Sequence, residues 1–145
     1  MYFYSPVPSS CSVSCEFGPY PPHIAKLTGR TDHLGIDFAP PDSSRAQNIS
    51  IMAAGTGTIL RTGTDPAAGR YMIISHLFSY GLFLTFYMHM SDIIGKRNQL
   101  IRQGEKIGTM GATGLVTGPH LHFGFARLYL DRITFIDPRK HILLP

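Results

Sequence analysis

The stretch TGPHLHFGFARL, residues 117–128, begins with turn-forming residues and continues as an apolar run with polar residues between. Such a run predicts a strand from His120 to Leu128. Side chains on a strand alternate between its two faces, so His120 and His122 point the same way, about 7 Å apart along the backbone. Leu121, between them, is expected to face the core. The two histidines can therefore serve one site.

Similar short runs follow one another from Leu34 onward, separated by Gly, Pro, Asn and Asp. Tight connections at residues 54–57 and 67–69 favour hairpins, and residues 91–100 could form a short turn of helix. The predicted fold is mainly β, an antiparallel two-sheet sandwich or a half-open barrel. The other expected strands are Leu34–Phe38, Ile49–Ala53, Thr56–Arg61, Tyr71–His76, Leu82–Met90 and Lys106–Met110.

A chain of 145 residues is long enough to bury one core without disulfide bonds, so a single domain over residues 1–145 is expected. Residues 1–29 are rich in Pro, Ser and Gly and are predicted to form an irregular lead-in, with one short strand near Val13–Phe17. Residues 30–128 would form the functional core and residues 129–145 a C-terminal extension.

The formal net charge of +4 and the pI near 9.3 favour polyanionic surroundings. Lysines and arginines are spread along the chain without a recognition motif, which argues against direct nucleic-acid binding. The N-terminus lacks the basic flank and long apolar core of a secretory signal, and no apolar run is long enough to span a bilayer. The sequence therefore predicts neither membrane insertion nor export by a standard signal.

The two cysteines, Cys11 and Cys15, lie close together in the sequence. A disulfide between them would close only a short loop and stabilise the chain modestly. No second cysteine pair completes a Cys-His zinc site, so two ordinary thiols are the favoured interpretation.

Three further residues, His33, Asp37 and His89, are candidates for chemistry. His33 and Asp37 are four residues apart around Gly35, which favours a loop leading into a strand; taken alone, such a pair is usually only a polar loop. His89 ends an aromatic strand on which Tyr87 is expected to share its face, and a core histidine is the structural alternative. A histidine-rich set with one carboxylate and no thiolate is typical of a hydrolytic zinc site.

These motifs resemble those of the lysostaphin-like, or LytM-type, zinc metallopeptidases. The resemblance covers roughly residues 16 to 125, in the family's order, through HLGIDFA at 33–39, AGTGTI at 54–59, YMHMS at 87–91, GEKIGTMGATG at 104–114 and TGPHLHF at 117–123. It implies a duplicated hybrid motif fold with an open groove and one Zn²⁺ per chain. It also implies an endopeptidase that hydrolyses peptide cross-links of bacterial peptidoglycan and acts at the cell wall.

Carried over residue by residue, the resemblance makes His33, Asp37 and His122 the zinc ligands and His89 and His120 the catalytic histidines. Groove walls would come from residues 111–118 and from the loops near residues 40 and 64. The glycines of the first segment could equally serve only as turns.

Several alternatives remain open beside the peptidase. A catalytically silent, zinc-binding cell-wall binding or regulatory module would hold metal without turnover. A lipoyl-like carrier would need a lysine at an exposed hairpin tip, which the sequence does not offer, and a serine hydrolase would need a nucleophile elbow that is absent. A short chain without an export signal also fits a phage-borne enzyme.

Overall fold

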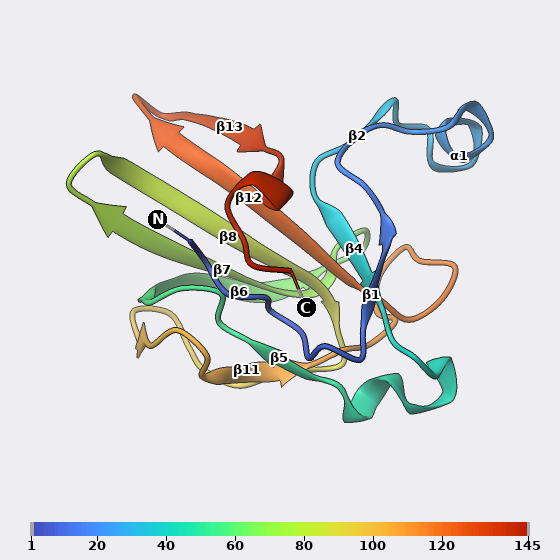
Figure 1. The fold of residues 1–145 in the computed structure, drawn as a ribbon, viewed down its shortest axis with the longest axis horizontal. Coiled ribbons are helices and arrows are strands. Elements are labelled where there is room, and N and C mark those ends of the chain that lie inside the picture. The colour runs from blue at the N-terminus through green and yellow to red at the C-terminus, as the bar shows by residue number, and fades with distance from the viewer. Residues whose placement is uncertain (1, 145) are drawn as a thin grey trace.

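The computed structural model describes residues 2–144 and is built mainly from antiparallel strands (Figure 1). The largest sheet has eight strands in the order β1-β4-β12-β8-β7-β6-β10, with β13 also paired to β12. A three-stranded sheet, β5-β11-β9, and a two-stranded sheet, β2-β3, complete the fold. The predicted antiparallel, mainly β architecture is thus confirmed, and the sheets do not close into a barrel.

The elements have the following bounds. The largest sheet contains β1 Ser12–Cys15, β4 Ile36–Ala39, β6 Gly57–Asp65, β7 Gly69–Phe78, β8 Gly81–Met90, β10 Leu100–Ile101, β12 Leu121–Tyr129 and β13 Arg132–Ile136. The smaller sheets contain β2 Gly18–Pro19, β3 Asp32–His33, β5 Ser50–Met52, β9 Asp92–Ile93 and β11 Lys106–Thr109, and the helices are α1 Pro22–Thr28, η1 Ser43–Asn48 and η2 Pro138–Lys140.

The central strands β8 and β12 are apolar on both faces. One face, with Tyr87, Phe123 and Phe125, belongs to the main core, which also includes Ile51 of β5 and Ile107 of β11. The opposite face carries a smaller apolar cluster of Leu84, Phe86 and Ala126, against which Phe135 of β13 packs. Burial on both faces explains why β8 reads as an almost continuous apolar run.

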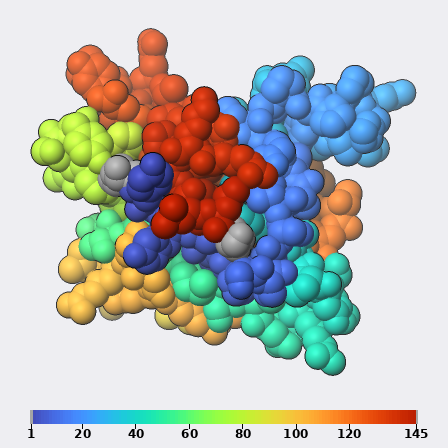
Figure 2. Space-filling model, viewed as in Figure 1, coloured from blue at the N-terminus to red at the C-terminus, as the bar shows by residue number. Residues whose placement is uncertain are grey.

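The two ends of the chain cover the core side of the large sheet together. Phe3 is fully buried, its amide donates to the carbonyl of His141, and its carbonyl accepts from the amide of Leu143. Figure 2 shows the first and last segments of the chain in contact on one face of the molecule. The C-terminal segment is therefore part of the packed fold.

The structure corrects the expected connection at residues 54–57, which is not a hairpin. It carries the chain from β5 in the small sheet to β6 in the large one, and its polar groups bond to other elements. Ala53 donates to the carbonyl of Glu105, and Ala54 donates to the hydroxyl of Tyr87. The other expected hairpin, through residues 67–69, is confirmed by the β6–β7 pairing.

The expected helical turn at residues 91–100 is also wrong. Ile93 pairs with Gly108 in β11, and the amide of Ile94 donates to the carbonyl of Ile107. Ladder hydrogen bonds therefore satisfy the backbone here, and Gly95, with a φ of +120°, turns the chain away afterwards. Local helix propensity is weak enough for such tertiary pairing to override it.

Several elements lie where the sequence predicted none, and α1 and β13 are the longest of them in the two end segments. The lead-in contains α1, which begins with a proline at its first turn and ends at Gly29 in the left-handed conformation, the usual place for each residue. The C-terminal segment contains β13. Of the described residues 2–144, no helix is long and apolar enough to cross a membrane.

Candidate functional site

The predicted site residues gather on the face of β12 that points away from the main core. Leu121 and Phe123 are fully buried in that core, so His122 faces the other way, as the alternation predicts. His122 pairs across the ladder with Asp37 of β4. Directly opposite residues of an antiparallel pair share a face. The strand register alone therefore brings the two side chains together.

The side chains of His33, Asp37 and His122 meet, and one atom of each lies within hydrogen-bonding distance of the other two. His33 Nε2 lies 3.0 Å from Asp37 Oδ1 and 3.0 Å from His122 Nδ1, and His122 Nδ1 lies 3.0 Å from Asp37 Oδ1. Donor atoms of a tetrahedral zinc site with bonds of 2.0–2.1 Å are roughly 3.3 Å apart. The triangle formed by these three atoms is therefore close to the size that such an ion requires.

The hydrogen bonding of His33 tests whether a cation fits this triangle. Its Nδ1 lies 2.7 Å from the carbonyl of Glu16, so the Nδ1–H donates there and the neutral ring carries its lone pair on Nε2. That lone pair faces the Asp37 carboxylate and His122. Such a convergence of acceptors needs a proton or a metal ion between them, and the three residues could hold a divalent metal.

His89 and His120 lie beside the triangle with their rings 4.8 Å apart. Each is held by its Nδ1, which lies 2.9 Å from the carbonyl of Thr113 in His89 and 3.0 Å from the carbonyl of Gly118 in His120. His120 Nε2 lies 3.8 Å from Asp37 Oδ2. Both rings are therefore oriented through Nδ1.

The orientation of His89 differs from the predicted one. Tyr87 faces the main core, whereas His89 lies beside His120 on the other side. The β7–β8 register shifts between the pairs Arg70↔Met90 and Met72↔Tyr87, and His89 has a φ of 65°. This bulge adds one residue to β8 and turns the His89 side chain to the opposite face.

A loop contact holds the bulge in place. The amide of His89 donates to the carbonyl of Ala68, and the hydroxyl of Thr113 donates to the carbonyl of Met90. Gly69 and Gly114 have positive φ values and touch each other's turns, so residues 67–70 and 113–115 form one packed unit. Gly114 is thus required by the packing of these two loops, because a side chain there would collide with the neighbouring backbone. At Gly118, by contrast, an added Cβ would meet nothing within 4 Å.

Electrostatics sets different proton affinities within the cluster. Although burial opposes it, hydrogen bonding to His122 and His33 holds the pKa of Asp37 well below its usual range. Burial and the neighbouring His120 lower the pKa of His89 to about 4. Burial also lowers the pKa of His122, whereas Asp37 raises that of His33 despite burial. His89 is therefore neutral at pH 7.

Cys15 also lies at the site, which the sequence did not indicate. Its Sγ, a ring nitrogen of His33 and a carboxylate oxygen of Asp37 all lie within 4.8 Å of one another. Both cysteines are free, and burial together with the charge of Asp37 raises the pKa of Cys15. No spacing signal connects Cys15 to residues so far along the chain.

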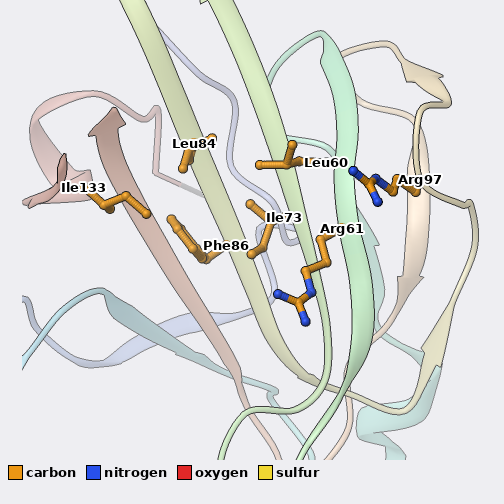
Figure 3. Close-up of a pocket in the computed structure, with 7 residues that line it drawn as sticks. All are labelled: Leu60, Arg61, Ile73, Leu84, Phe86, Arg97 and Ile133. Atoms are coloured by element: carbon orange, nitrogen blue, oxygen red, sulfur yellow. The ribbon is translucent and has the colours of Figure 1, made fainter. Parts of the chain in front are cut away.

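An apolar hollow lies on the same face of the sheet (Figure 3). Phe86, in its floor, pairs with Gly124, two residues along β12 from His122. The lining is apolar apart from two arginines; it comprises Leu60, Arg61, Ile73, Leu84, Phe86, Arg97 and Ile133.

Comparison with known proteins shows the family of this chain. The profile of peptidase family M23 matches residues 31–135, which include His33, Asp37, His89, His120 and His122. The chain belongs to peptidase family M23. Cys15 and Glu16 precede the matched range of this M23 chain.

The chain is also similar to individual proteins of known name. The peptidoglycan DD-endopeptidase ShyA of Vibrio cholerae is 38% identical over 119 residues, which are 81% of this chain and 25% of ShyA. The chain thus spans about a quarter of the length of the curated relatives it matches.

Solved structures share the fold of this M23 chain. A zinc-containing peptidase from Vibrio cholerae superposes with a TM-score of 0.73 at 33% identity, over 93% of this chain and 39% of that one. The catalytic domain of lysostaphin from Staphylococcus simulans gives 0.71 at 27% identity, over 89% and 90% of the two chains.

Proposed function

We propose that this M23 chain is a zinc-dependent endopeptidase that hydrolyses peptide cross-links of bacterial peptidoglycan, acting at the cell wall as one domain over residues 1–145. The observation that carries the proposal is the meeting of His33 Nε2, Asp37 Oδ1 and His122 Nδ1 at mutual distances of 3.0 Å. The names of relatives such as ShyA support the substrate class.

His33, Asp37 and His122 would hold one zinc ion. When bound, such an ion acts as a Lewis acid and lowers the pKa of a bound water towards 7. The carbonyl of Glu16 fixes the ring of His33 so that Nε2 stays directed at the site. The side chains of the three residues are largely buried, which would limit the access of water to the ligand atoms.

The two remaining histidines take different roles in this proposal. The Nδ1–H of His89 donates to the carbonyl of Thr113, which leaves the lone pair of the neutral ring on Nε2, so Nε2 would accept a proton from the attacking water. His120 lies on the other side of the triangle's carboxylate, with its Nε2 3.8 Å from Asp37 Oδ2. In its protonated form, His120 would donate a hydrogen bond from Nε2 to the developing oxyanion and then transfer that proton to the leaving amine.

The test measures zinc content and peptidoglycan hydrolysis in wild type, His122→Ala and His120→Ala, each stripped of metal and reloaded. Wild type should bind about one zinc per chain and release new amine termini from purified peptidoglycan. His122→Ala should lose both properties, whereas His120→Ala should keep zinc and lose activity by about 10²–10⁴-fold.

The same experiment tests the silent wall-binding or regulatory module. Stoichiometric zinc in wild type without new amine termini from several peptidoglycan chemotypes would favour that module. A wild-type chain that binds no zinc would refute the assigned metal site altogether.

A further inference from the structure

Cys15 lies in one row with two of the proposed ligands across three neighbouring strands. β1, β4 and β12 are adjacent in the large sheet (Figure 1), and their registers pair Cys15 with Asp37 and Asp37 with His122. Directly opposite residues share a face and have Cβ atoms about 4.5–5.5 Å apart. Cys15 and His122 therefore flank Asp37 from its two sides.

A bulge in β1 produces this alignment. Val13 pairs with Phe38, but Cys15 pairs with Asp37, so Ser14 is an extra residue on β1. Without the bulge, Ser14 would stand opposite Asp37 and Cys15 would point to the other face. Ser14 instead donates its hydroxyl to the backbone carbonyl of Asp37. The local backbone thus directs the thiol to the site.

The thiol lies near two of the three residues of the triangle. Its Sγ lies within 4.8 Å of ligand atoms of both His33 and Asp37. Zinc bonds of about 2.3 Å to sulfur and 2.0–2.1 Å to nitrogen place such atoms roughly 3.6 Å apart in a tetrahedron, so the thiol would move towards His33 and Asp37 when it binds the metal. The hydrogen bond that the thiol donates is a weak one, 3.9 Å to the carbonyl of Glu16, which metal binding would replace.

We propose that Cys15 is a fourth metal ligand that closes the coordination sphere formed by His33, Asp37 and His122. The inference rests on the proposed function, since it presupposes that metal. As the sulfur–metal bond forms, the thiol proton passes to solvent and one bound water leaves. A catalytic zinc site needs an open position, whereas four protein ligands make a closed one. Cys15 therefore holds the metal in a resting form that opens only when the thiol moves away.

Cobalt substitution tests the sulfur bond directly. The full chain, stripped of metal and reduced, is loaded with Co²⁺, because a thiolate ligand to Co²⁺ produces an intense near-ultraviolet charge-transfer band that nitrogen and oxygen ligands do not. We expect the band in wild type and its loss in Cys15→Ser. Cys11→Ser is the matched control, because Cys11 is buried in the core and should leave the band unchanged. Circular dichroism checks that each variant folds.

Two further readouts follow from a fourth ligand. Zinc affinity in Cys15→Ser should fall by more than the ~10-fold that loss of a ligand's hydrogen-bonding partner produces. Peptidoglycan hydrolysis at saturating zinc should rise severalfold, because the open position is no longer occupied by sulfur. Unchanged or lower activity in this variant would overturn the closing role.

The outcomes separate this inference from the proposed function. Stoichiometric Co²⁺ in wild type without a charge-transfer band overturns the Cys15 ligand while leaving the metal site intact. Failure of wild type to bind Co²⁺ or Zn²⁺ at all overturns the proposed function itself.

Discussion

His89 has a backbone φ of 65°, a conformation that costs a residue with a Cβ roughly 1–2 kcal/mol. Glycine escapes this cost but loses more entropy on folding. We therefore expect His89→Gly to be about 0.5–1 kcal/mol more stable than His89→Ala, as measured by urea unfolding, although both lose peptidase activity. Equal stabilities, or a more stable alanine variant, would contradict a strained bulge at this position.

The same bulge shows which parts of the site the sequence could predict. His120 and His122 follow strict alternation from Leu121, so their shared face was predictable. Cys15 and His89 each follow an extra residue in a strand, which moves a side chain to the opposite face. Nothing in the residue types marks which strand of a pair takes the extra residue, so neither orientation could be derived.

At the scale of elements, Gly114 joins the loop that holds His89 to the β6–β7 turn. Its φ is +84°, and an added Cβ would lie 2.4 Å from the amide nitrogen of Gly69. We expect Gly114→Ala to lower stability by about 2 kcal/mol and to reduce activity, because the Thr113 carbonyl that orients His89 must shift. Gly118→Ala is the control and should stay within about 0.5 kcal/mol in thermal unfolding. Similar losses in both variants would refute the contact.

A second element-scale link runs from η2 to His33, one of the proposed metal ligands. The guanidinium of Arg139 forms a bidentate pair with Glu16, whose backbone carbonyl accepts from His33. This exposed pair is worth up to about 1 kcal/mol. Arg139→Ala should lower stability by that amount and speed zinc loss to a chelator, whereas Arg132→Ala should do neither. A double-mutant cycle with Glu16→Gln that shows no coupling would disprove the link.

The elements that were not predicted from the sequence lack a local sequence pattern typical of their structure. β12 and β13 are joined by Leu130 and Asp131, both with positive φ. Hairpin turns of this kind favour Asn-Gly or Asp-Gly, so Leu-Asp gives no indication of a hairpin. The helix α1 buries none of its residues and therefore shows no apolar period. The strands around the core were predictable because their burial imposes a pattern.

At the scale of the whole molecule, stability should depend on pH through His76, a fully buried residue that is not among the proposed metal ligands. Its Nδ1–H donates to the carbonyl of Thr56, its Nε2 lies 2.8 Å from the hydroxyl of Thr85, and Phe3 packs edge-on against the ring. Burial lowers the pKa of His76, although the Thr56 carbonyl opposes this. The neutral imidazole is thus part of the core.

The sign of the effect follows from proton linkage. Below the unfolded-state pKa of about 6.5, the unfolded chain binds a proton at residue 76 that the native state does not, so stability falls as pH falls. The loss should continue until the pH reaches the lowered native-state pKa and then level off. We expect the unfolding free energy of metal-free wild type to fall more between pH 8 and pH 5 than that of His76→Gln, whose amide can form both hydrogen bonds. The other titrating residues are the same in both proteins, so parallel pH profiles would show that His76 is not the group responsible.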